Sequence, residues 1–191
     1  MTRVKRDLLR RKSMIKELLR LCSDKNKASL YTNFSEPDKF HYGIVLAVDE
    51  NEIAVQMISP DGDDDGVTVM SVDNVFRVEV GGQYAGKMEK LCSGRTLRAY
   101  ELPPCDDGIL MSALSYALAE KEVVSIELIG SGYNDIVGIP ETIDGEECAI
   151  RQIDEYGCED GFSFISVSDI TKLSFATDAE KRIMRLWEMN V

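Results

Sequence analysis

Residues 61–66 (DGDDDG) have the acidic spacing of a calcium-binding loop. Oxygen-bearing side chains occupy the first, third and fifth positions and glycine the sixth, as at the start of an EF-hand loop. That loop also needs a glutamate at its last position, where this chain has Val72. The segment recurs 95 residues later as YGCEDG, with Tyr156 and Cys158 in place of two ligands. The pattern therefore predicts a repeated structural turn and no metal site. The turn residues are Gly62, Asp65, Gly66, Gly157, Asp160 and Gly161.

Other chemistry-bearing residues form no recognisable catalytic or cofactor site. His41 is the only histidine, and the residue 95 positions later is Ile136. A packed or partly exposed imidazole is therefore expected there, and not a general base. The chain has no GxSxG, Walker or dinucleotide motif. We expect no enzyme, cofactor or metal, and scattered carboxylates are the one catalytic alternative that stays open.

Cysteine usage and hydropathy indicate a compartment. The chain has five cysteines, an odd number, and no CxxC pair. Such a set is typical of reduced thiols in a cytoplasm. No apolar run approaches the ~20 residues of a membrane helix. The basic N-terminus lacks the apolar segment of a secretory signal. These patterns predict a cytoplasmic protein without membrane contact.

Charge is divided unevenly along the chain. The net charge is −12, yet residues 1–27 carry ten Lys and Arg against three Asp and Glu. The acidic remainder is a poor ligand for nucleic acid. The basic segment has helical periodicity over residues 3–22, and its cations are candidates for contact with nucleic acid or an anionic membrane surface. The favoured interpretation is that its apolar face packs on the protein while the cations pair with acidic neighbours. The candidate nucleic-acid-binding residues are Arg3, Lys5, Arg6, Arg10, Arg11 and Lys12.

An internal repeat sets the architecture. Residues 40–80 align without a gap on residues 135–175, with eleven identical pairs. Random pairing would give roughly two or three identities. Each repeat predicts a helix, five short strands and a closing helix. The first copy has helices at 3–22 and 84–91, with strands at 28–34, 40–48, 53–57, 67–72 and 75–80. The second has helices at 110–118 and 183–187, with strands at 123–130, 136–143, 147–153, 162–167 and 170–175.

Domain boundaries follow from this repeat. We expect a first repeat with its basic helix at 1–91, a linker at 92–107 that contains two prolines, and a second repeat at 108–191. Asp106 or Asp107 is the expected N-cap of the second repeat's first helix. Five short strands with tight turns favour a small barrel over a flat sheet. The predicted fold class is mainly β with flanking helices (α+β), with two tandem five-stranded barrels.

Short motifs in both repeats resemble those of Sm and Sm-like proteins, some of which other SH3-like barrels share. Gly43, Val45, Val48 and Asp49 match the first Sm signature, as do Gly138, Pro140, Ile143 and Asp144. Residues 71–75 (SVDNV) are similar to the second signature. The resemblance implies two Sm-like barrels. The positions that bind RNA in that family are changed alike in both copies, to Glu52-Ile53 with Ser71-Val72 and to Glu147-Cys148 with Ser166-Val167. It therefore implies the barrel and not the RNA pocket.

The function predicted from these patterns is a non-enzymatic interaction or scaffold protein. The resemblance implies open edges on the fourth and fifth strands, through which Sm proteins assemble into rings. The two repeats are expected to pair with each other, or chains to associate, through such edges. The alternative is an RNA-associated protein that binds nucleic acid through the basic N-terminal helix.

Overall fold

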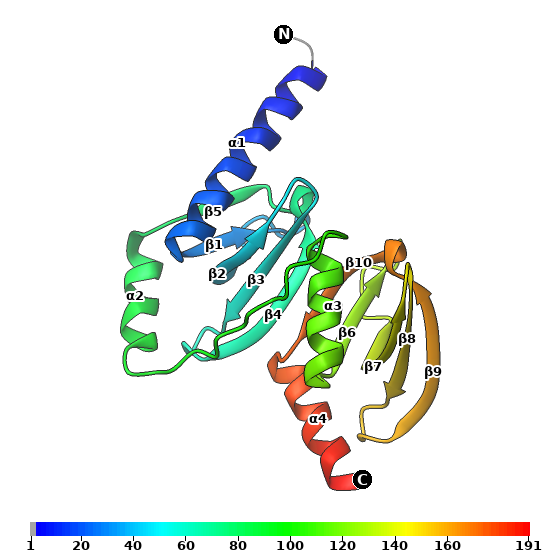
Figure 1. Cartoon of the computed structure of the whole chain (residues 1–191). Coiled ribbons are helices and arrows are strands. Elements are labelled where there is room, and N and C mark those ends of the chain that lie inside the picture. Colours follow the sequence, from blue (N-terminus) through cyan, green and yellow to red (C-terminus); the bar gives the residue numbers. More distant parts are fainter. Residues whose placement is uncertain (1–2) are drawn as a thin grey trace. The chain divides into compact units, whose positions relative to one another are not determined.

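The computed structural model describes the backbone of residues 3–191 and the side chains of residues 9–191 (Figure 1). The described residues form ten strands and four α-helices, so the predicted α+β class is confirmed. The elements of the first half are α1 (Arg3–Asp24), β1 (Lys27–Tyr31), β2 (His41–Val48), β3 (Glu52–Ile58), β4 (Asp64–Ser71), η1 (Val72–Asn74), β5 (Arg77–Glu79) and α2 (Gly82–Cys92). Those of the second half are α3 (Ile109–Glu120), β6 (Val124–Leu128), β7 (Ile136–Asp144), β8 (Glu147–Ile153), β9 (Glu159–Ser166), η2 (Val167–Asp169), β10 (Ile170–Phe175) and α4 (Asp178–Asn190).

The chain divides into two compact units. Unit 1 contains the residues up to Asp64 together with Ser71–Tyr100. Unit 2 contains Asp65–Met70 and Glu101–Val191. The division cuts through β4, whose central residues belong to unit 2 although they come from the first repeat.

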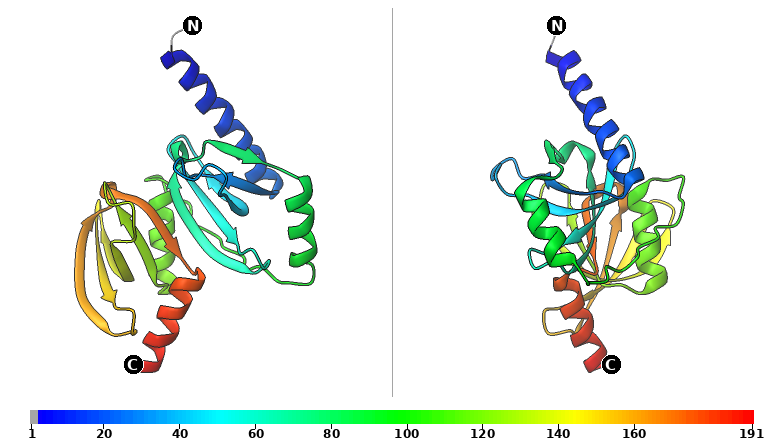
Figure 2. Two further views of the ribbon diagram at one scale, coloured as in Figure 1. Left: turned by 180° about the vertical axis from the view of Figure 1, so that it is seen from behind. Right: turned by 90° about the vertical axis from the view of Figure 1, so that its left-hand side faces the viewer.

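Unit 1 has the strand order β5-β1-β2-β3. The second half of α1 lies beside its strands, whereas the first half extends away from them (Figures 1 and 2). Leu18 and Leu21 in that second half are fully buried, whereas Leu19 between them is half exposed. The helix ends at Asp24, and Lys25 directly after it adopts a left-handed conformation with φ 51°. α2 packs Ala85 and Met88 into a core cluster with Tyr42 and Ile58.

Unit 2 has the strand order β4-β10-β6-β7-β8-β9. β10 pairs with β6 as β5 pairs with β1, so both repeats place their fifth strand beside their first. β5 and β9 are edge strands, and the described strands do not form a closed barrel. The arrangement as two barrels therefore stays a prediction.

Residues 95 positions apart, which we call counterparts, occupy equivalent places. A Cβ on Gly62 would lie 2.9 Å from Leu91 Cβ, and a Cβ on Gly157 would lie 2.5 Å from Leu186 Cβ. Leu91 and Leu186 are themselves counterparts on α2 and α4. These turn glycines therefore let the closing helix of each repeat approach the strands, which explains why glycine stands in both copies.

Some predicted boundaries were wrong. The N-cap of α3 is Gly108, with no side-chain hydrogen bond, and not Asp106 or Asp107. The first strand ends at Tyr31 instead of residue 34, because Asn33 Oδ1 accepts a hydrogen bond from Ser35 N and turns the chain. Residues 93–108 between α2 and α3 form neither helix nor strand. Among the described helices, none is both long and apolar enough to cross a membrane.

Candidate functional site

The basic helix is the first candidate site, and two of its described cations, Arg10 and Arg11, contact other parts of unit 1. Arg10 Nη2 donates to the carbonyl oxygen of Phe76 at 3.1 Å. Lys12 is exposed. The side chains of Arg3, Lys5 and Arg6 lie outside the described residues.

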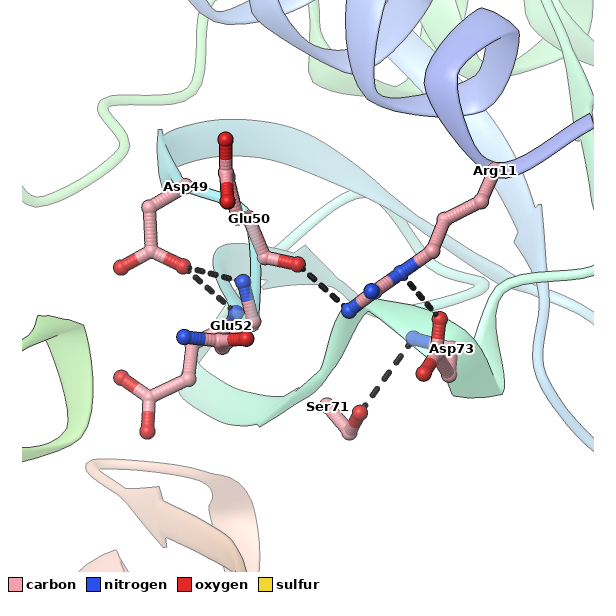
Figure 3. Close-up of polar contacts among 7 residues, drawn as sticks. Arg11, Asp49, Glu50, Glu52, Ser71 and Asp73 are labelled. Carbon is pink, nitrogen blue, oxygen red and sulfur yellow. Dashed lines mark hydrogen bonds and ion pairs between the residues drawn. The ribbon is translucent and has the colours of Figure 1, made fainter. Parts of the chain in front are cut away.

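Arg11 bridges two turns of unit 1 (Figure 3). Its Nη2 donates to the carbonyl oxygen of Glu50 at 2.7 Å, in the turn between β2 and β3. Its Nε lies 2.8 Å from Asp73 Oδ1, in η1. The guanidinium is thus held between the regions of the two signature-like motifs. Because both side chains are partly exposed, the ion pair contributes modestly to stability.

These two turns are built by hydrogen bonds to backbone groups. Asp49 Oδ1 accepts from the backbone nitrogens of Asn51 and Glu52, both at 2.7 Å. Val72 N donates to Asn51 O at 2.9 Å. In the second repeat, Val167 N donates to Glu146 O at 2.7 Å, between the counterparts of Val72 and Asn51. The backbone hydrogen bond donated by Val72 therefore recurs at its counterpart Val167 in the second repeat.

The Arg11 contact is specific to the first repeat. The counterpart of Asp73 is Ser168, and the counterpart of Arg11 is Asp106. A groove of about 260 Å³ beside this contact is lined by Arg10, Arg11 and apolar side chains that include Met14 and Phe76. Asp73 is also one of its lining residues.

The calcium-like loop directs its carboxylates to separate partners. Asp63 pairs with Arg95. Asp64 Oδ1 accepts from Gln56 Nε2 at 2.6 Å. Within unit 2, Asp65 Oδ1 accepts from the backbone nitrogen of Asp178 at 2.9 Å. In the part of the chain that the structure describes, no group of three or more His, Cys, Asp or Glu residues is placed to hold a metal ion.

The glycines of this loop and its copy adopt conformations that favour glycine. Gly62 and Gly66 have φ of 88° and 69°, and Gly157 and Gly161 have 76° and 81°. Gly62 and Gly157 lie in the turns as predicted, whereas Asp65 with Gly66 and Asp160 with Gly161 lie at the starts of β4 and β9, so for these four residues the predicted turn was wrong. His41, the other isolated candidate, is exposed at the start of β2.

The second candidate site is a pair of strand edges in unit 2. β4 and β10 pair antiparallel, so that the fourth strand of the first repeat lies beside the fifth strand of the second. Val67 and Phe175 are directly opposite and fully buried. On the other face, Thr68 Oγ1 and Ser174 Oγ lie 3.0 Å apart, both buried. The side chains on both faces of this pairing are therefore buried.

The counterparts of these buried residues are exposed. Val67 and Val69 correspond to Phe162 and Phe164 on β9, which are 49% and 78% exposed. Phe175 corresponds to Val80, directly after β5, which is 48% exposed. No strand pairs with the outer edge of β9 among the described residues. β9 and the residue directly after β5 therefore expose apolar side chains of the kind that the β4–β10 pair buries.

A close backbone approach completes the β4–β10 pair. A Cβ on Gly66 would lie 2.3 Å from Phe175 O and Ala176 C. Gly161 is the counterpart of Gly66, and a Cβ there would meet nothing within 4 Å. The space beside Gly161 is open where the space beside Gly66 is filled.

The sequence interpretation named the edges of the fourth and fifth strands but not Phe162, Phe164 or Val80. The signal was present in the repeat alignment. It aligns Phe162 and Phe164 with Val67 and Val69, which the structure shows to be buried. Exposure, which the sequence does not state, is what makes them a candidate site.

Comparisons of the chain with protein-family models, with curated proteins and with solved structures gave no match.

Proposed function

We propose that the protein is a non-enzymatic scaffold, built from two Sm-like barrels, that self-associates through its strand edges. In this proposal β9 of one copy pairs with β5 of the next. The observation that carries it is the β4–β10 pair, in which a fourth strand and a fifth strand already bind in this way.

The repeat fixes the register of the proposed contact. In the β4–β10 pair, Val67 lies opposite Phe175 and Val69 opposite Leu173. Their counterparts predict the register between two copies. The expected pairs are Phe162 with Val80, Ser163 with Glu79, Phe164 with Val78 and Ile165 with Arg77.

Burial of Phe162 and Phe164 supplies the driving force. Covering one exposed phenylalanine contributes roughly 2 kcal/mol. Backbone hydrogen bonds between two edges add to it and set the orientation. Because association costs about 4 kcal/mol or more, the contact is expected to depend on protein concentration.

The ends of the strands also complement each other. Asp65 accepts from the first helical nitrogen of α4, Asp178 N. The counterpart of Asp65 is Asp160, and that of Asp178 is Gln83, in the first turn of α2. The N-cap of α2 is Gly81, so no N-cap side chain accepts a hydrogen bond from the first turn of this helix. Asp160 of one copy is expected to accept from Gln83 N of the next, at the positive end of α2.

The nucleic-acid alternative receives less support from the contacts. Arg10 and Arg11 donate to backbone oxygens of their own unit, and Arg11 also pairs with Asp73. Cations engaged in this way release fewer counterions on contact with phosphates.

Multi-angle light scattering over a wide range of protein concentration tests the proposal. The wild-type mass is expected to rise with concentration, and Phe162→Ser with Phe164→Ser is expected to keep the chain monomeric. Tyr133→Ser is the matched control, because Tyr133 is an exposed aromatic residue outside the strands. A monomer at all concentrations contradicts the proposal. Binding of nucleic acid with a steep salt dependence favours the alternative.

Cysteine cross-linking tests the register. Val80→Cys and Phe162→Cys are placed in separate chains that carry Cys158→Ser, since native Cys158 is exposed. A mixed disulfide is expected under mild oxidation, because directly opposite residues lie within disulfide range. Val80→Cys with Phe164→Cys is the control, two residues out of register and ~7 Å apart. Equal cross-linking of both mixtures contradicts the register.

A further inference from the structure

Unit 1 binds a segment of its own linker that is neither helix nor strand. Gln56 Nε2 donates to the carbonyl oxygen of Arg98 at 2.8 Å and to Asp64 Oδ1 at 2.6 Å. Tyr100 Oη donates to Asp64 Oδ2 at 2.8 Å. Gln56 and Tyr100 are both buried, and Leu97 packs against the core cluster. Residues 97–100 thus lie on a site where Gln56 donates to a backbone carbonyl, Asp64 accepts from a hydroxyl and the core cluster contacts an apolar side chain.

The second repeat carries the same pair of positions without such a cover. The counterparts of Gln56 and Asp64 are Arg151 and Glu159. Arg151 Nη1 lies 3.5 Å from Glu159 Oε2, so the two side chains remain neighbours. Gln56 is 4% exposed, whereas the side chains of Arg151 and Glu159 are 32% and 47% exposed. A polar pair that is buried in unit 1 is accessible in unit 2.

A groove adjoins this pair in unit 2. It has a volume of about 590 Å³ and lies between the end of α3, β7 and α4. Arg151 forms part of its wall, and Ile139 is directly opposite Arg151 on β7. The counterpart of Ile139 is Ile44, which packs on the same core cluster of unit 1 as Leu97. The apolar lining consists of Leu118, Ile139, Pro140, Met184 and Trp187.

We propose that this groove binds an extended peptide segment of a partner protein, in the way that residues 97–100 lie on unit 1. The peptide places an apolar side chain against Ile139 and Trp187. The following residue offers its backbone carbonyl to Arg151, and a tyrosine two residues further donates its hydroxyl to Glu159.

Charge restricts the partner further. Glu120, Glu141 and Glu188 lie on the groove with Lys121 and Arg151, which leaves an acidic balance. A peptide that is neutral or basic fits this balance better than an acidic one. The segment on unit 1 follows the same rule, since it carries Arg98. The proposal goes beyond self-association and does not depend on it, because a monomer presents the same groove.

The probe is a synthetic peptide with the sequence of residues 95–101, RTLRAYE, added to the full-length protein. Trp187 is the only tryptophan of the chain and lines the groove, so its fluorescence reports binding directly. A saturable change in emission is expected. A scrambled peptide of the same composition is expected to cause none.

Variants separate this groove from unit 1. Arg151→Ala is expected to weaken binding about tenfold or more, because a hydrogen bond from a charged donor is lost. Arg151→Gln, which reproduces Gln56, is expected to keep most of the affinity. A peptide with phenylalanine in place of its tyrosine is expected to bind several-fold more weakly. Circular dichroism verifies that each variant is folded.

Three outcomes would overturn the proposal. The first is an absence of saturable binding, measured by Trp187 emission and by calorimetry. The second is binding that Arg151→Ala leaves unchanged. The third is binding that responds to Gln56→Ala and not to Arg151→Ala, because the peptide would then have displaced the linker from unit 1.

Discussion

The hydroxyl oxygens of Thr68 and Ser174 lie 3.0 Å apart, buried on one face of the β4–β10 pair. The two residues belong to different repeats and are 106 positions apart in the chain. Each hydroxyl forms with the other a hydrogen bond that it would otherwise form with water. A strand of the first repeat therefore contributes to the stability of unit 2.

Replacing one of these hydroxyls is expected to cost more than replacing both. Thr68→Val leaves the Ser174 hydroxyl buried without this partner, at a cost of about 1–3 kcal/mol. Adding Ser174→Ala removes the unsatisfied group and is expected to recover part of that loss. Urea denaturation of the two single variants and the double variant measures the coupling. Strict additivity would show that the two hydroxyls do not form this bond.

Gly66→Ala and Gly161→Ala are expected to differ strongly, although both glycines have positive φ. A Cβ on Gly66 meets the backbone of Phe175 and Ala176 at 2.3 Å, whereas one on Gly161 meets nothing within 4 Å. Gly161→Ala is therefore expected to cost about 1–2 kcal/mol from the left-handed conformation alone. Gly66→Ala is expected to cost more, because its Cβ would also push β4 and β10 apart.

Thermal or urea unfolding at low protein concentration measures this difference, because the chain is then a monomer under the proposed function. Equal destabilisation by the two variants would contradict the close approach at Gly66. At high concentration Gly161→Ala is also expected to reduce association. In the proposed contact Gly161 takes the place of Gly66, and Gly81, next to β5, takes the place of Ala176. The added Cβ of one copy would therefore meet the backbone of the next.

The fold class and the order of the elements were predictable from the sequence for physical reasons. The alternation of Ile53, Val55 and Met57 marks one face of a strand, and β3 spans Glu52–Ile58. The pairing of β4 with β10 was only one of two stated options. Alternation determines which face of a strand is buried, but it does not select between two apolar neighbours of similar character.

The contacts of the candidate site were harder to predict. Pairing of the basic helix with acidic residues was expected, and Arg11 with Asp73 is one such pair. The chain has 34 Asp and Glu residues, so charge alone could not select the partner. Selection depends on where α1 lies over η1, which is a tertiary relationship. The exposure of Phe162 and Phe164 is likewise invisible to periodicity, because β9 lacks the neighbour that covers β4.

Burial of Cys148 predicts a dependence of stability on alkaline pH. Burial raises the pKa of its thiol from the ordinary value of about 9 to about 11. Between these values the folded chain retains a proton that the unfolded chain has released, so the contribution of Cys148 to stability falls as pH rises from about 9 to about 11. Cys148→Ala is expected to make the stability curve flatter over this range.

Labelling with iodoacetamide offers a second measurement, because the thiolate is the reactive form. Exposed Cys158 is expected to react first and Cys148 only on unfolding. Mass spectrometry of the labelled peptides identifies the sites. Labelling of Cys148 in the folded protein at the rate of Cys158 would contradict its burial.

Arg11→Ala is expected to destabilise unit 1 more than Asp73→Ala does. The first change removes both the ion pair with Asp73 and the hydrogen bond to Glu50 O, whereas the second removes only the ion pair. The side chains are 39% and 62% exposed, so the coupling between them is expected to be at most about 1 kcal/mol. A double-mutant cycle by urea denaturation measures this coupling, which is expected to shrink in high salt.

If Arg11 instead binds nucleic acid, Arg11→Ala should reduce polyanion binding while Asp73→Ala strengthens it, because loss of the carboxylate frees the cation. Stability and binding measured on the same two variants therefore decide between a structural and a nucleic-acid-binding role for the basic helix.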